Sequence, residues 1–93
     1  MTSIIFSDEY ELLPRYLIEQ RRRAGLSQRE LADRMRRSQS HVYKMETRQR
    51  RIELIEFCRY VESLGGDPAE ALEGFLARLA GARAGAEPME KAA

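Results

Sequence analysis

Two serines, each placed just before a short apolar helical pattern, constrain the fold of this sequence more than any other feature. Ser27 is followed three residues later by Glu30, and the pair forms the capping-box signature of a helix start. Ser38 offers a second N-cap after a turn of about three residues. The sequence therefore predicts two short helices, over residues 28–35 and 39–47, joined by a tight turn.

Three further helical patterns flank this pair, and no stretch alternates between apolar and polar residues for long enough to predict a strand. Pro14 suits the first position of a helix, where its missing N–H costs nothing, and Gly25 would end that helix. The three helices are expected over residues 14–24, 53–64 and 68–80. The apolar stripe of the middle one consists of Leu54, Phe57, Cys58, Val61 and Leu64. We therefore expect an all-α fold.

The length of 93 residues suits one small domain with a modest core. We expect an N-terminal extension over residues 1–11 and a helical domain over residues 12–80. The remainder, residues 81–93, is rich in Ala, Gly and Glu and has nothing large to bury. This segment is expected to be a flexible tail.

Several classes of protein are disfavoured by composition. No apolar run approaches the roughly 18 residues of a membrane span, and the N-terminus is acidic where a secretory signal would be basic, so we expect a cytoplasmic protein. The single cysteine, Cys58, cannot form an internal disulfide, and one histidine gives no zinc ligand set. No nucleophile with a base, carboxylate pair or glycine-rich phosphate loop is found. We expect no enzyme, no metal and no cofactor.

The charge is distributed unevenly along the chain, although the net charge is only +1. Residues 1–14 hold three acidic residues and no basic one, which gives −3. Residues 15–51 hold twelve basic against four acidic residues, which gives +8, and residues 52–93 hold four against eight, which gives −4. A basic middle between acidic ends indicates a polyanionic partner, and nucleic acid is the leading candidate. The alternative is that these charges are solvated helix faces.

The predicted helix over residues 39–47 has one apolar and one polar face. Val42 and Met45 lie three residues apart and are expected to pack on the core, which leaves the opposite side chains outward. A major groove roughly 12 Å wide admits one helix with its N-terminal end against the bases. The side chains expected to read bases are Gln39, Ser40, Tyr43 and Lys44. The Gln39 amide can donate to and accept from adenine, whereas Lys44 can only donate and favours guanine.

Two longer stretches carry a resemblance to a known family. GLSQRELADRMRRSQSHVYKME resembles the helix-turn-helix of the phage Cro/repressor family, also called the xenobiotic-response-element (XRE) type. QRRIELIEFCRYVESLGGDP is similar to the helix that follows in small bacterial members, and the resemblance covers roughly residues 12–68. It implies a compact five-helix, lambda-repressor-like domain that binds double-stranded DNA. The protein is then expected to be bacterial or from a phage, and nucleoid-associated when bound.

The resemblance also implies roles for individual residues. Gln28 is expected to touch a phosphate, and Arg21 is expected to form a structural ion pair with Glu46. Base reading carries over to three of the residues named above, Gln39, Ser40 and Lys44. A partly buried ion pair of this kind is weak evidence for net stability.

Arginines stand where the family usually has glycine, at Arg36 in the turn and at Arg48 after the second helix. Both positions are expected to need a positive φ, so arginine should cost some stability there. The expected gain is electrostatic, because cations at both ends of the helix would meet phosphates and release counterions. The expected phosphate contacts are Gln28, Arg29, Arg37, Ser38, His41, Arg48, Arg50 and Arg51. The alternative for His41 is an ordinary exposed side chain without a DNA contact.

A last apolar stripe follows Pro68 at helical spacing. It consists of Leu72, Phe75, Leu76 and Leu79. This stripe can cover the core of one copy or pair with a second copy, and the few base pairs that one module reads favour a homodimer. The leading hypothesis is a dimeric, sequence-specific repressor of transcription. The alternatives are an antitoxin or adaptor that binds a protein partner through this helix, and a structural DNA binder without sequence preference.

Overall fold

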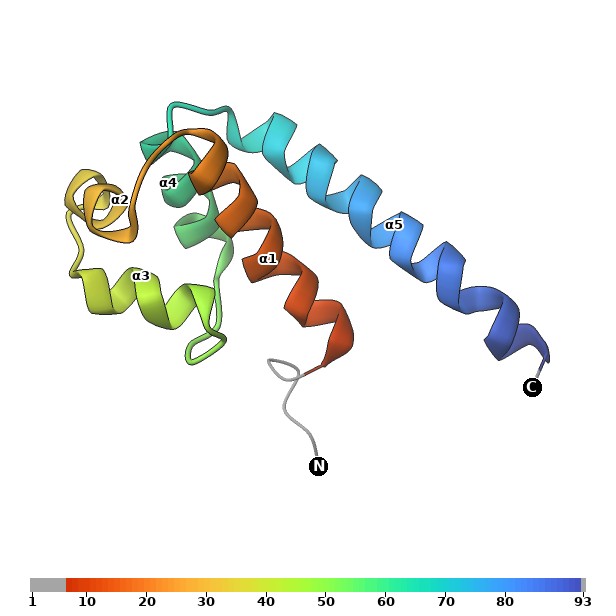
Figure 1. The fold of residues 1–93 in the computed structure, drawn as a ribbon. Coiled ribbons are helices and arrows are strands. Elements are labelled where there is room, and N and C mark those ends of the chain that lie inside the picture. Colours follow the sequence, from red (N-terminus) through yellow and green to blue (C-terminus); the bar gives the residue numbers. More distant parts are fainter. Residues whose placement is uncertain (1–6, 93) are drawn as a thin grey trace.

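Helices account for the regular structure of residues 7–92, the part of the chain whose backbone the computed structural model describes, with side chains described for residues 7–85 (Figure 1). They are α1 (Asp8–Arg23), α2 (Gln28–Met35), α3 (Gln39–Glu46), α4 (Leu54–Ser63) and α5 (Pro68–Ala92). The expected five-helix, all-α fold is therefore confirmed.

The first helix begins earlier than the sequence predicts. Ser7 is its N-cap, with a side-chain oxygen that accepts from the Tyr10 N–H at 3.0 Å, and acidic residues fill the first turn. Pro14 consequently lies inside α1 instead of at its start, and residues 8–11 are helical instead of forming an extension. A non-local contact favours this start, because the Tyr10 hydroxyl accepts from the Ile52 N–H at 2.9 Å.

The pair of short helices follows the prediction closely. The capping box at Ser27 is complete, since its side chain accepts from Glu30 while Glu30 accepts from the Ser27 N–H. Ser38 caps α3 by accepting from the His41 N–H at 3.1 Å. The expected left-handed backbone is found at both arginines, with φ of 58° at Arg36 and 62° at Arg48.

The core lies where α1 to α4 meet. Its buried apolar residues are Tyr16, Leu17, Leu31, Ala32, Met35, Val42, Met45, Phe57, Tyr60 and Val61. Leu54 was expected among the inward-facing residues of α4, but its side chain is 64% exposed. It is the first residue of that helix, and the buried face of α4 is formed by residues further along it. Cys58 is partly buried against the core, as expected of a small apolar side chain.

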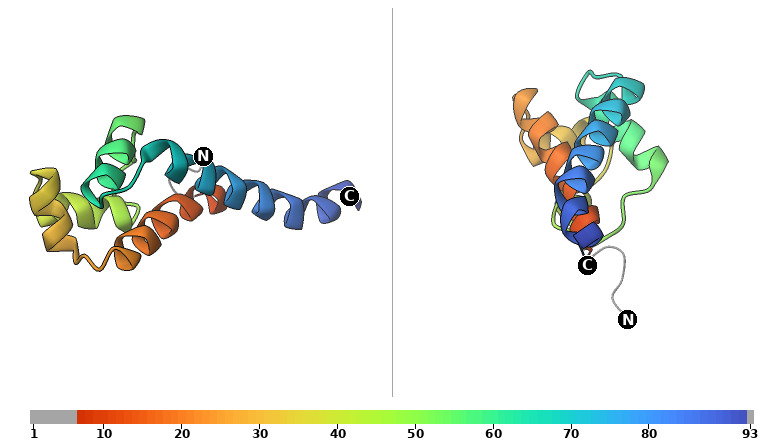
Figure 2. Two further views of the ribbon diagram at one scale, coloured as in Figure 1. Left: turned by 90° about the horizontal axis from the view of Figure 1, so that it is seen from above. Right: turned by 90° about the vertical axis from the view of Figure 1, so that its right-hand side faces the viewer.

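The last helix continues to Ala92, so the expected end near residue 80 is wrong. Alanine is the strongest helix former, and the segment needs no large apolar residue to stay helical. Two ion pairs fasten α5 to α1: Arg78 donates to Glu19 at 2.8 Å, and Arg83 donates to Glu9. Beyond the body of the protein, α5 projects as a single rod (Figure 2).

Candidate nucleic-acid interface

The four residues predicted to read bases lie exposed on one side of α3. Gln39 and Tyr43 are one helical turn apart, as are Ser40 and Lys44, so the four form a continuous polar strip. On the opposite side Val42 and Met45 are fully buried. These two apolar anchors fix how α3 is rotated, and therefore hold the polar strip toward solvent. We refer to these four residues, Gln39, Ser40, Tyr43 and Lys44, as the polar strip of α3.

A buried carboxylate holds the other end of α3 to three neighbouring segments. Glu46 accepts from Arg21 through Nε at 2.8 Å and Nη2 at 3.0 Å, so the predicted pair is bidentate. It also accepts from Nε2 of Gln28 at 2.9 Å and lies 2.7 Å from the Tyr60 hydroxyl. Arg21 in turn donates to the Leu26 carbonyl at 2.9 Å. The two charges are thus compensated by several hydrogen bonds, as buried ions require.

Two of the groups around Glu46, Arg21 and Tyr60, are held in their protonated forms. The hydrogen bond from Arg21 to Glu46 raises the pKa of the guanidinium. Burial raises the pKa of the Tyr60 hydroxyl, and the nearby Glu46 carboxylate raises it further. Tyr60 therefore stays protonated and can donate to the carboxylate. Sequence reasoning missed Tyr60, although a tyrosine on the buried stripe of α4 is a residue that needs a polar partner.

Gln28 stands at the start of α2, with its side chain half-buried against Glu46. One amide hydrogen is used by Glu46, and the second remains free for a phosphate oxygen. Ser38 is in a similar position, because its oxygen accepts from the His41 N–H while its own hydrogen remains free to donate.

Three of the predicted phosphate contacts have carboxylate neighbours inside the protein. Arg50 donates to Oε2 of Glu56 at 2.7 Å, and Nε2 of His41 lies 3.0 Å from the same oxygen without the alignment of a hydrogen bond. Arg48 lies 3.6 Å from Glu11 of α1. Sequence reasoning missed Glu56, because no local pattern connects it to residues in α3 and the following loop.

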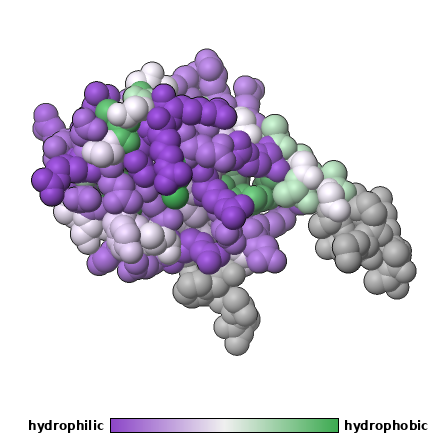
Figure 3. Space-filling view, viewed as in Figure 1, coloured by the Kyte–Doolittle hydropathy of each residue, from purple (hydrophilic) through white to green (hydrophobic). Residues whose placement is uncertain are grey.

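The remaining predicted cations are exposed. They are Arg29, Arg37 and Arg51, and none forms an ion pair with another described residue. Hydrophilic residues cover most of the face over α2 and α3 that Figure 3 shows. A polar, cationic surface therefore surrounds α3.

The predicted dimer stripe lies on one face of α5, and only part of it is packed against the body of the protein. Phe75 packs edge-on against Tyr16 of α1, with ring centroids 5.9 Å apart, and Leu79 lines a cleft beside Leu13. Leu72 and Leu76 instead remain 37% and 50% exposed. Hydrophobic residues accordingly appear where α5 leaves the body in Figure 3.

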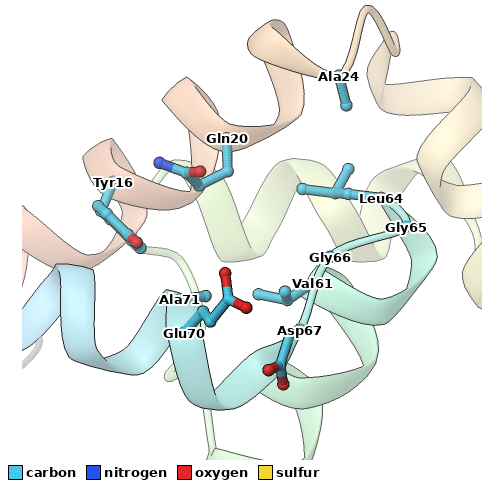
Figure 4. Close-up of a pocket in the computed structure, with 10 residues that line it drawn as sticks. All are labelled: Tyr16, Gln20, Ala24, Val61, Leu64, Gly65, Gly66, Asp67, Glu70 and Ala71. Atoms are coloured by element: carbon cyan, nitrogen blue, oxygen red, sulfur yellow. The ribbon is translucent and has the colours of Figure 1, made fainter.

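A cavity of about 300 Å³ lies between α1, the end of α4 and the start of α5 (Figure 4). Tyr16 and Gln20 of α1 border it, and Asp67 and Glu70 lie on its other side. Its walls include none of the predicted DNA-contacting residues, so it belongs to a different part of the surface.

Neither a helix that could span a membrane nor a cluster of metal ligands is found in the part of the chain that the structure describes. Within it, no helix has both the length and the apolar character that crossing a membrane demands. Nor do the described His, Cys, Asp and Glu residues gather in a group of three that could hold a metal ion.

Comparisons with known proteins place this geometry in a family. Residues 13–73 match the family described as helix-turn-helix domain. A solved structure, the XRE-family like protein from Pseudomonas syringae pv. tomato str. DC3000, is 40% identical and superposes with a TM-score of 0.71 over 75% of this chain and 85% of that chain. No curated protein matches the sequence. The chain thus belongs to the XRE-type helix-turn-helix family of DNA-binding regulators.

Proposed function

We propose that this protein is a sequence-specific regulator of transcription that reads double-stranded DNA by inserting α3 into the major groove. The polar strip on α3 carries the proposal. Its glutamine, serine, tyrosine and lysine can donate to or accept from base edges, and the buried Val42 and Met45 hold them outward.

Phosphate contacts would hold α3 in register without reading sequence. We assign these contacts to Gln28, Arg29, Arg37, Ser38, His41, Arg48, Arg50 and Arg51. Each cation that meets a phosphate releases counterions, so affinity should fall as salt rises.

We further propose that the regulator binds as a homodimer and acts as a repressor. One module of this size reads few base pairs, and two half-sites about one helical turn apart would provide useful specificity. Leu72 and Leu76 support an interface along the exposed edge of the packed face of α5, because a second copy would remove both from water. A dimer across a promoter would then exclude RNA polymerase.

The experiment that tests base reading is selection of bound duplexes from a random library, followed by titration of the selected site. Gln39→Ala should weaken binding to that site by about 1–3 kcal/mol and leave binding to scrambled duplex nearly unchanged. Gln20→Ala is the matched control, because it removes the same amide from the side chain that borders the cavity in Figure 4.

Two results would contradict the proposal. A selection that enriches no sequence would favour a structural DNA binder. Equal losses on selected and scrambled duplex in Gln39→Ala would show that the amide reads no base.

A second candidate function is that of an antitoxin or adaptor, and the exposed Leu72 and Leu76 favour it as well. The solution mass of the purified protein separates the two functions. A dimer that binds the selected site favours the regulator. A monomer that forms a one-to-one complex with a protein from the native host, through α5, favours the second candidate.

A further inference from the structure

One carboxylate lies among the cations that are proposed to meet DNA. Oε2 of Glu56 accepts from Nη2 of Arg50 at 2.7 Å and lies 3.0 Å from Nε2 of His41. Nη1 of Arg50 lies 3.5 Å from Nδ1 of the same imidazole. The three side chains come from α3, the loop after it and α4, and they form one cluster beside the start of α3.

The members of the cluster differ in their access to solvent. The side chains of Glu56 and His41 are 12% and 16% exposed, whereas that of Arg50 is 41% exposed. Arg50 is therefore the member that an approaching phosphate meets first. The carboxylate lies behind it and is fixed to the body of the protein by α4.

The pairing of Glu56 with Arg50 is incomplete. The guanidinium is bound through one carboxylate oxygen, while the other oxygen, Oε1, is buried and has no hydrogen-bond partner among the described residues. Contact through a single oxygen is weaker than the two parallel bonds of a bidentate pair. A phosphate, which offers several acceptor oxygens, can compete with such a partner.

We propose that Glu56 competes with DNA phosphate for Arg50, and so lowers the affinity of this protein for duplexes of every sequence. The inference rests on the proposed function, because it requires Arg50 to face DNA. In the free protein the carboxylate neutralises the guanidinium. On binding, Arg50 leaves Glu56 and contacts a phosphate. The free energy gained from the phosphate contact is therefore reduced by the attraction between Arg50 and Glu56 that is lost.

The effect is independent of sequence because Glu56 acts on a phosphate contact and not on the polar strip of α3. Phosphate contacts are shared by specific and nonspecific complexes. Glu56 therefore sets how strongly the protein is held by bulk DNA, while Gln39 and its neighbours set which site is preferred.

The test is Glu56→Gln, an isosteric change that removes the charge and keeps an oxygen that can accept from Arg50. Binding to a short random-sequence duplex is titrated over a range of salt concentrations. Affinity should rise by up to about eightfold at about 0.1 M salt, and the slope of log K against log salt should steepen by up to about 0.9, the value for one phosphate neutralised in full, because no carboxylate charge then offsets Arg50.

Glu62→Gln is the control for net charge, because it removes one acid from the exposed far end of the same helix. Glu62→Gln should leave the slope of log K against log salt unchanged, because the Glu62 charge is screened by salt and lies away from Arg50. An unchanged or reduced affinity in Glu56→Gln, or an equal gain in Glu62→Gln, would overturn the inference.

A double variant tests whether Glu56 acts through Arg50. In protein that already carries Arg50→Met, the change Glu56→Gln should give a clearly smaller gain than it gives in the unaltered protein, because only the part of the effect that acts through Arg50 is lost. A gain of the same size without Arg50 would refute the exchange. If the unaltered protein binds no duplex at all, the proposed function itself fails. If it binds duplex but the Glu56 variants behave otherwise than expected, only the inference about Glu56 fails.

A comparison that leaves Glu56 in place covers the case in which its variant does not fold. Arg50→Met should lose less affinity for random-sequence duplex than Arg37→Met, because the exposed Arg37 has no carboxylate partner among the described residues. Equal losses from the two variants would count against competition by Glu56.

Discussion

Arg36 and Arg48 hold backbone conformations that residues other than glycine rarely adopt, with φ of 58° and 62°. Arg36 ends α2 in the left-handed conformation, and this lets the chain turn directly into the cap of α3. The turn at residue 36 requires the left-handed backbone conformation, and the arginine side chain adds a positive charge at the same place. Local strain and cationic surface are thus located on the same residue.

Replacing Arg36 by glycine should therefore stabilise the fold. The left-handed conformation costs a residue with a Cβ about 1–2 kcal/mol, and the extra freedom of glycine in the unfolded chain offsets about 0.5–1 kcal/mol of the gain. Urea denaturation followed by circular dichroism should show the free energy of unfolding rising by about 0.5–1 kcal/mol. Arg37→Gly, one residue later, is the control and should give no increase. A less stable Arg36→Gly protein would contradict the argument.

The last helix has two different sides at the element scale. One side packs on α1 through Phe75 and through two ion pairs, Arg78 with Glu19 and Arg83 with Glu9. Leu72 and Leu76 lie at the edge of this packed side and remain partly exposed, while the far side carries small residues such as Ala77. A close approach marks the packed side, since a Cβ on Gly74 would lie 2.5 Å from the Tyr16 hydroxyl.

Acid should loosen this helix from α1. The hydrogen bonds from Arg78 and Arg83 lower the pKa of Glu19 and Glu9 from the ordinary value of 4.5. Because these folded-state pKa values are lowered, the carboxylates stabilise docking at pH above 4.5, and the effect is lost as pH falls through the lowered values. Hydrogen exchange of α5 amides, corrected for intrinsic rate, should show less protection at about pH 3 than at about pH 6.

Glu19→Gln should weaken docking at both pH values and reduce the difference between them. Protection of α5 that does not depend on pH in the unaltered protein would show that the apolar contacts of Phe75 alone hold the helix.

Across the whole molecule, the proposed reading surface on α3 and the exposed leucines on α5 belong to different helices. The polar strip can therefore meet DNA while α5 meets a second copy. The same separation means that the proposed dimer and the proposed DNA contact can be altered independently.

Leu76→Glu should break the proposed dimer without unfolding the subunit, because half of this side chain is already exposed. Light scattering should then report the mass of a monomer. Affinity for a selected two-half-site duplex should fall by at least about tenfold, while affinity for a single half-site stays nearly the same. Ala77→Glu adds the same charge at the neighbouring exposed position and should preserve the dimer. A Leu76→Glu protein that remains dimeric would place the interface elsewhere.

The parts of the fold that could be predicted are those set by neighbours in sequence. Ser27 and Ser38 fixed the starts of α2 and α3 because a cap bonds to an N–H three residues on. The start of α1 was misplaced although Ser7 is a cap of the same kind, because Pro14 also suits the first position of a helix. The bond that anchors Tyr10 to Ile52, by contrast, joins residues distant in sequence. The contact of Glu56 with Arg50 likewise depends on how α4 packs.

The Glu46 network bears on how this protein could acquire new targets. One carboxylate connects α3 to Arg21 of α1, Gln28 of α2 and Tyr60 of α4, and none of these bonds involves the outward strip. The packing of the domain and the identity of the outward residues on α3 can consequently be changed separately. Exchanging the outer residues of α3 for those of a relative should redirect the protein to that relative's operator while the domain melts at an unchanged temperature.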